Sequence, residues 1–100
     1  MKTIFHICPR EAWEAAQQNG VYKAESLESE GFIHCSKAEQ IAGVANTFYK
    51  GIEGLVLLHI AINKLQVEVR WEEVGEEVYP HIYGPINLDA VVEVEDFEVG

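Results

Sequence analysis

Cysteine and long apolar runs are scarce in this chain of 100 residues. The two cysteines, Cys8 and Cys35, are too few for the disulfide framework of a small secreted domain. The longest apolar run, 55–62, is too short to span a bilayer, and no charged start leads into an apolar signal segment. These absences favour a reducing, cytoplasmic setting and no membrane partner.

Positive charge is scarce as well. The chain has 7 Lys and Arg against 17 Asp and Glu, which gives a net charge of −10, and its basic residues are scattered. Nucleic-acid binders usually carry a basic patch, because contacts with phosphates supply much of their affinity. We therefore expect no nucleic-acid partner. A small anionic ligand stays compatible with the composition, since one local arginine or a helix N-terminus is enough to hold it.

The length and the hydrophobic content predict one domain. Hydrophobic residues make up 48% of the chain, which is enough for a core without disulfides. A chain of this length suits a single domain over 1–100 and not two. We expect it to be a monomer.

Hydrophobic spacing predicts an α+β fold. Two main helices are expected at about 9–18 and 37–49, the second behind a capping-box pattern that starts at Ser36. Strands are expected at 3–7, 31–35, 55–62, 67–71 and 91–98, and the run 55–62 is apolar enough to be buried on both faces. Because strands and helices do not alternate regularly, the pattern favours a split sheet of mixed or antiparallel strands.

Most reactive side chains lie in two segments. The segment 31–36 ends in His34, Cys35 and Ser36, where a predicted strand meets a helix start. The segment 79–85 contains His81 and Tyr83 between two prolines, and the two side chains share one face if the backbone is extended. Histidine is the side chain most easily poised near neutral pH. A site formed by both segments is the prediction.

Other residues suggest chemistry less strongly. Trp71 is expected in the core, while Arg70 either pairs with nearby acids or holds an anionic ligand. Glu72 lies in an acidic stretch, which is typical of a solvated surface. His59 lies within the apolar run, so we expect a core histidine there. A zinc site is not expected, because the short paired ligand spacings typical of zinc are missing.

Several longer stretches resemble a known family. They include Glu-Gly-Phe-Ile-His-Cys-Ser at 30–36, Pro-His-Ile-Tyr-Gly-Pro at 80–85, Phe-His-Ile at 5–7 and Arg-Trp-Glu at 70–72. Over nearly its whole length the chain resembles domain of unknown function 952, a family of small bacterial and plant proteins with no established activity. The resemblance implies a fold similar to that of ADP-ribosyltransferases.

The resemblance also implies roles for some residues. RNA 2′-phosphotransferases of that fold carry His-Gly-Thr on the first strand and His-Leu-Ser later, and His6 and 34–36 stand at the matching places. In relatives that use NAD, the first histidine contacts ribose and a tyrosine stacks on nicotinamide. By similarity His6 would contact ribose, and Tyr22 or Tyr83 would stack. Here Ile-Cys replaces Gly-Thr, and no catalytic glutamate is recognisable.

We therefore expect a nucleotide- or NAD-like small molecule to bind in a cleft shared by three histidines, in a binding protein or a transferase-like enzyme. NAD is the only cofactor suggested. The predicted catalytic residues are His81, His34 and His6; the predicted ligand-binding residues are Ser36, Tyr83, Tyr22 and Arg70; no metal ligand is predicted. One alternative is a ligand-binding or protein-interaction module without turnover. A second is a hydrolase in which Cys35 is the nucleophile and a histidine the base.

Overall fold

Eight strands and three α-helices make up the computed structural model, which describes residues 2–99. The strands are β1 (Thr3–Pro9), β2 (Val21–Tyr22), β3 (Ile33–His34), β4 (Leu55–Ala61), β5 (Glu68–Val74), β6 (Glu77–Tyr83), β7 (Ile86–Asn87) and β8 (Val91–Phe97). The α-helices are α1 (Arg10–Asn19), α2 (Glu25–Ser29) and α3 (Ile41–Phe48), and short 3-10 turns lie at 38–40, 62–64 and 88–90. None of the described helices is long and apolar enough to cross a membrane.

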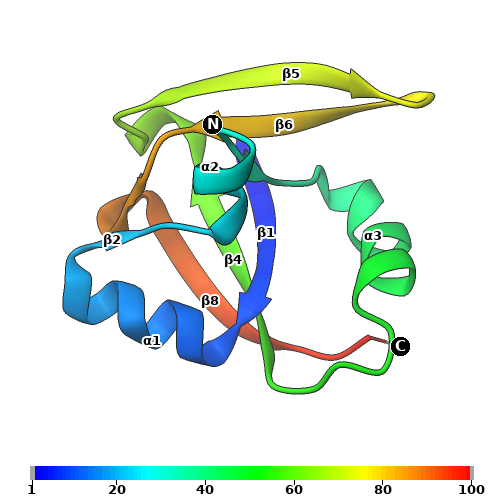
Figure 1. Ribbon diagram of the computed structural model, residues 1–100, viewed down its shortest axis with the longest axis horizontal. Helices are drawn as coiled ribbons and strands as arrows, with labels where there is room; N and C mark the ends of the chain where they lie inside the picture. The colour runs from blue at the N-terminus through cyan, green and yellow to red at the C-terminus, as the bar shows by residue number, and fades with distance from the viewer. Residues whose placement is uncertain (1, 100) are drawn as a thin grey trace.

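The strands form two three-stranded sheets and one short pair. Their orders are β1-β4-β8, β3-β6-β5 and β2-β7, and every described pair is antiparallel. In Figure 1 the β5–β6 hairpin lies across the end of the molecule where β1 begins. A bridge between Phe5 and Ser36 joins the two larger sheets, because the amide of each donates to the carbonyl of the other at 2.9 and 2.8 Å.

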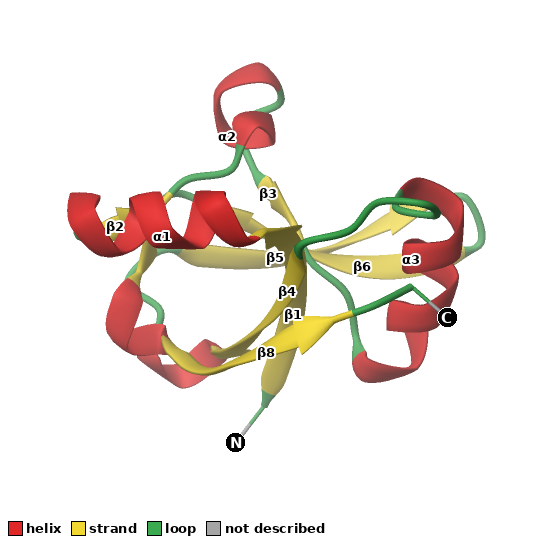
Figure 2. Cartoon of the chain, turned by 90° about the horizontal axis from the view of Figure 1, so that it is seen from below, coloured by secondary structure: helices red, strands yellow, loops and turns green. Residues whose placement is uncertain are grey.

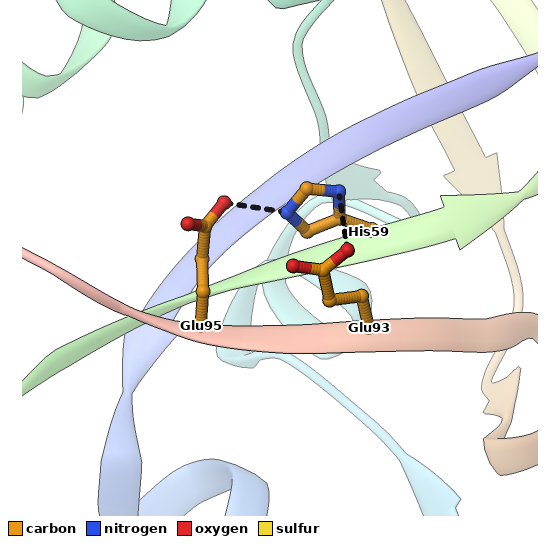
Figure 3. A group of neighbouring side chains, drawn as sticks. All are labelled: His59, Glu93 and Glu95. Carbon is orange, nitrogen blue, oxygen red and sulfur yellow. Dashed lines mark hydrogen bonds and ion pairs between the residues drawn. The ribbon is translucent and has the colours of Figure 1, made fainter.

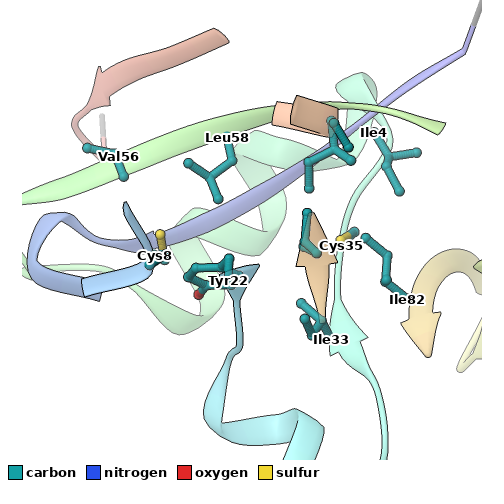
Figure 4. Packing of buried hydrophobic residues seen from close by; sticks show 12 residues of the cluster. Ile4, Cys8, Tyr22, Ile33, Cys35, Val56, Leu58 and Ile82 are labelled. Carbon is teal, nitrogen blue, oxygen red and sulfur yellow. The ribbon is translucent and has the colours of Figure 1, made fainter. Parts of the chain in front are cut away.

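The central strand β4 is covered on both faces. Helices α1 and α3 lie on opposite sides of the β1-β4-β8 sheet in both views (Figures 1 and 2). Leu58 belongs to the larger core cluster with Ile4, Ile33 and Ile82, and Figure 4 shows these side chains turned toward one another. Leu57 belongs to a second cluster on the α3 side. Each fully buried aliphatic side chain of this kind contributes about 1.5–3 kcal/mol.

Local sequence explains where the helices begin and end. Pro9 precedes α1 in an extended conformation, and Gly20 ends it with φ 86°, a left-handed conformation in which glycine carries no Cβ penalty. The predicted cap at Ser36 is wrong by one residue: the main-chain N–H of Lys37 donates to Gln40 Oε1 at 2.9 Å, and a 3-10 turn comes before α3. Ser36 is instead held by its bridge to Phe5.

The α+β class, the split antiparallel arrangement and the two main helices are confirmed. Two core assignments are wrong. Trp71 is 42% exposed, and it lies on β5, the edge strand of its sheet. His59 is only partly buried, and its ring bonds a surface carboxylate rather than a core partner.

Candidate functional site

A cleft of about 460 Å³ lies between β1, the β5–β6 hairpin and α3. Helix α3 closes one side, and the exposed Phe48 and Val74 stand among its lining residues. The bridge between Phe5 and Ser36 brings the two sheets together at this cleft. The lining residues are Phe5, His6, Ile7, His34, Cys35, Ser36, Val44, Phe48, Tyr49, Val74, Tyr79 and His81. The structure therefore brings the three predicted histidines and Ser36 to one cavity.

His34 and His81 face each other from neighbouring strands. They are register partners on β3 and β6, and their ring centroids lie 5.4 Å apart at 77°. The ring of Phe32 stacks on His81 at 4.2 Å and also meets the edge of His34 at 4.9 Å. Because side chains alternate along a strand, all three rings lie on the same face of the hairpin sheet. Two imidazoles are thus held close together by an aromatic neighbour.

A carboxylate fixes the orientation of the His81 ring. The Nδ1–H of His81 donates to Glu72 Oε1 at 2.7 Å, and the Tyr83 hydroxyl donates to the same oxygen at 2.5 Å. These hydrogen bonds, with that of Tyr83 the larger cause, hold the pKa of Glu72 below its usual value, so the carboxylate stays ionised at neutral pH.

The second nitrogen of His81, a residue that lines the cleft, has no hydrogen-bond partner among the described residues. His81 is 4% exposed, and its Nε2 makes no hydrogen bond to the residues described here. No fully buried side-chain nitrogen or oxygen among those residues lacks a partner, so Nε2 keeps some accessible surface. Since Nδ1 carries the proton in the neutral ring, Nε2 is a lone-pair acceptor. An imidazole that is hydrogen-bonded to a carboxylate through one nitrogen and has its other nitrogen free is a typical general base.

His6 has a supporting position. Its Nδ1–H donates to the His34 carbonyl at 2.6 Å, and its Nε2 accepts the hydroxyl proton of Tyr22 at 2.8 Å. The carbonyl can only accept, which fixes this tautomer. Burial lowers the pKa of His6 to about 4, so the ring is neutral at pH 7. With both nitrogens bonded inside the protein, His6 has no nitrogen left for a ribose hydroxyl.

Tyr22 does not fit its predicted role. The side chain is 2% exposed, belongs to the larger core cluster and does not line the cleft. Burial raises its pKa, and its hydroxyl is turned toward His6 and Cys8. The structure therefore places Tyr22 in the core, where its hydroxyl bonds His6 Nε2, and not on the lining of the cleft.

Tyr83 and Arg70 lie beside the cleft without lining it. The Arg70 guanidinium lies 4.3 Å from the centroid of the Tyr83 ring, and its Nε bonds Glu68 at 3.1 Å. Tyr83 also packs against Phe32 with centroids 5.4 Å apart. The two predicted ligand-binding residues thus form an outer layer that steadies Glu72.

The geometry gives no support to a cysteine nucleophile. Cys35 lines the cleft but is 4% exposed, and burial raises the pKa of its thiol far above neutrality. Burial also raises the pKa of Cys8 to about 11. The thiolate is the nucleophilic form, and it is therefore scarce at both positions.

Two residues that position the cleft were not among the predicted site residues. Glu72 was expected on the solvated surface, and its contact with His81 depends on the register of β5 against β6. Gln40 is buried between α3 and the hairpin, where its Nε2 donates to Glu77 Oε1 and to the Val78 carbonyl, both at 2.9 Å. The capping-box pattern that starts at Ser36 has Glu39 at its third position, so it did not point to Gln40.

One group of metal-type ligands lies on the β4–β8 strand pair. His59 Nε2 lies 2.6 Å from Glu95 Oε1, and its Nδ1 lies 4.0 Å from Glu93 Oε1 (Figure 3). Both carboxylates are largely exposed, and exposed ion pairs of this kind are common on protein surfaces. We therefore interpret the three residues as a surface ion-pair cluster that lies outside the cleft.

Comparison with known proteins places the chain in a family. Residues 7–94 match the family described as "Protein of unknown function (DUF952)", so the chain belongs to it and the resemblance seen in the sequence is confirmed. No curated protein matches the chain.

The fold is also seen in solved structures of protein CC0527 from Caulobacter crescentus. The crystal structure has a TM-score of 0.89 at 30% identity and covers 97% of this chain and 87% of that chain. The solution NMR structure has a TM-score of 0.83 at 30% identity, with 98% and 86% covered. A crystal structure of a double mutant gives 0.88 at 29% identity, with 97% and 87% covered.

Proposed function

We propose that the cleft binds a small molecule with a flat ring, of the nucleotide or NAD-like class, with the His81 imidazole as its main polar anchor. The single observation that carries this proposal is the fixed ring of His81, a lining residue whose Nδ1–H is bonded to Glu72 while Nε2 has no partner among the described residues. Ligand sites are usually concave and mostly apolar with a few convergent polar groups, and this cleft has that character.

The aromatic lining supports a ring-shaped ligand. Phe5, Phe48, Tyr49 and Tyr79 contribute aromatic side chains around the two imidazoles. Flat ligands gain from offset or edge contacts with such rings beyond the area that they bury. The volume of about 460 Å³ lies within the usual range for small-molecule sites.

An ADP-ribosyltransferase-like arrangement is part of the proposal. This arrangement rests on the sequence resemblance. The two matching segments are His6 on β1 and residues 34–36, which come just before the 3-10 turn that leads into α3. His6 would act through the His34 carbonyl rather than by touching ribose, since both of its nitrogens are bonded. A cytoplasmic location and a monomer complete the proposal, and the two free thiols fit a reducing compartment.

Binding without turnover is the form that the cleft supports best. Among the described residues no carboxylate lines the cavity, because Glu72 lies behind His81. A transferase would need a group that stabilises positive charge at the reacting ribose carbon. The three lining histidines, Ser36 and the two lining tyrosines supply hydrogen bonds but no negative charge.

Amide NMR with added NAD, ADP-ribose and AMP at millimolar concentration tests the proposal. We expect shifts that cluster at His34, Ser36 and His81, and we expect His81→Gln to weaken them. His59→Gln is the matched control, since His59 also pairs with a glutamate on a strand but lies outside the cleft. Absence of shifts at the cleft, or equal effects of both substitutions, would overturn the proposal.

A further inference from the structure

The charges around the cleft show which part of a nucleotide fits inside it. None of the twelve lining residues is a lysine or an arginine. Of the basic residues near the lining in sequence, Lys37 pairs with Glu39 at 3.8 Å and Arg70 with Glu68 at 3.1 Å, while Lys50 is exposed and does not itself line the cavity. The whole chain carries a net charge of −10. A phosphate placed in this cavity would therefore lose water without gaining a cationic partner, which is costly.

The hydrogen-bonding character of the two accessible imidazoles points the same way. In the neutral ring of His34, Nε2–H donates to Glu30 Oε2 at 3.0 Å, which leaves Nδ1 as an acceptor. Glu72 fixes His81 in the opposite tautomer, which leaves its Nε2 as an acceptor. In the neutral form each imidazole thus has one nitrogen that bonds no described residue and can only accept a hydrogen bond. A phosphate or carboxylate oxygen also offers only lone pairs, so it gains no hydrogen bond from a neutral imidazole nitrogen of this kind.

The remaining polar side chains of the cavity are neutral. His6 has no nitrogen to spare, since Nδ1 and Nε2 are both bonded within the protein. The hydroxyls of Ser36 and Tyr79 can donate, and neither makes a hydrogen bond to another residue of the described part of the chain. The third lining hydroxyl, that of Tyr49, donates to the Ile7 carbonyl at 3.4 Å. Neutral hydroxyls are a weak substitute for the arginine that commonly holds a phosphate.

From these contacts we infer that the cleft selects uncharged rings that carry N–H donors, such as a carboxamide or an amino-substituted base, over their phosphorylated or carboxylate counterparts. The inference rests on the proposed function and names its ligand class. The ring N–H groups meet the acceptor nitrogens of His34 and His81, the flat faces meet the aromatic lining, and any phosphate stays outside the mouth.

Matched pairs of ligands test this selectivity. Binding is measured by NMR titration at pH 8, where unperturbed imidazoles are neutral, for nicotinamide against nicotinic acid, cytidine against CMP, and adenosine against AMP. We expect each uncharged member to bind at least about tenfold more tightly, which corresponds to about 1.4 kcal/mol.

The outcomes separate the inference from the proposed function. If a charged member binds as tightly as its partner, the selectivity is overturned and the binding function stands. If none of the six compounds binds at millimolar concentration, both are overturned. A gain-of-function variant probes the electrostatic cause: Val44→Lys puts a cation on the half-buried lining of α3. It should narrow the preference for adenosine over AMP, and an unchanged preference would overturn the electrostatic argument.

Discussion

The His81 imidazole and the Glu72 carboxylate are joined across the β5–β6 hairpin by a hydrogen bond of 2.7 Å. The two residues are not register partners, since His81 stands opposite Arg70 and Glu72 opposite Tyr79. The contact is diagonal, and side chains at diagonal positions on one face of a sheet lie within reach of each other. It makes Glu72 the residue that determines which His81 nitrogen the cleft presents.

Removal of the carboxylate should release the His81 tautomer. We expect Glu72→Ala to raise the population of the Nε2–H form, because Nδ1 loses its charged acceptor. Long-range ¹H–¹⁵N NMR of the imidazole at pH 8 distinguishes the two tautomers. Glu73→Ala is the control, since adjacent residues of a strand point to opposite faces. The same tautomer in wild type and Glu72→Ala would contradict the assigned role.

Acid should destabilise the fold through His6. Burial lowers its pKa to about 4 in the folded state, against about 6.5 when it is unfolded. The unfolded chain therefore takes up a proton first, and the stability contributed by neutral His6 is complete above pH 6.5 and lost as the pH falls toward 4. The loss reaches about 3 kcal/mol below pH 4.

The His6 prediction has a direct readout. The Cε1–H resonance of His6 should keep its neutral position down to about pH 5, with a midpoint near 4. A midpoint near 6.5 would show that the ring is solvated and that its two internal hydrogen bonds do not persist in solution.

Tyr22→Phe should destabilise the protein without touching the cleft surface. The change removes the hydroxyl that donates to His6 Nε2 and leaves a buried acceptor unpaired. Such a loss costs about 1–3 kcal/mol, and each kcal/mol lowers the Tm by roughly 4–8 °C in a domain of this size. Calorimetry measures the change, with Tyr79→Phe as the control because Tyr79 is only partly buried. Equal Tm values for both variants would argue against the buried bond.

Gly84→Ala should disturb the strand end next to Tyr83. A Cβ at this position would lie 2.6 Å from Val67 Cγ1 and 2.9 Å from Val67 Cβ, well inside van der Waals contact. Overpacking of this kind costs about 1–3 kcal/mol. Chemical denaturation measures the loss, and Val67→Ala in the same chain should restore part of it. If Gly84→Ala alone were as stable as the wild type, the backbone at Gly84 and the side chain of Val67 would have to move apart at little cost.

Both thiols should resist alkylation in the folded protein. Cys8 and Cys35 are buried, and burial raises the pKa of each. Iodoacetamide at neutral pH, followed by mass spectrometry, should label them slowly before unfolding and rapidly after it. Fast labelling of Cys35 in the native state would return the hydrolase alternative to consideration.

The sequence predicted those elements whose periodicity is long. β1, α1, α3, β4 and β8 each span seven or more residues with a regular apolar pattern, and all were expected close to their observed positions. β2 and β7 have two residues each, too few for any periodic signal. Their pairing depends on tertiary contacts that join distant parts of the chain.

The candidate site was predictable in its residue types but not in its internal connections. His34 and His81 were expected together, and they are register partners. Glu72 was expected at the surface because a glutamate within an acidic stretch carries no local sign of a partner nine residues away. Trp71 was expected inside for the same reason: alternation shows which residues share a face, but not whether anything covers that face at a sheet edge.

Gln40 has a consequence for how a ligand would enter. Its amide accepts from Lys37 at one end and donates to the β6 strand at the other, so one side chain ties the segment that leads into α3 to the hairpin. The segment that leads into α3 and the β5–β6 hairpin cannot separate unless these hydrogen bonds of Gln40 break. The cavity is therefore preformed, and the chain would lose little conformational entropy when a ligand binds.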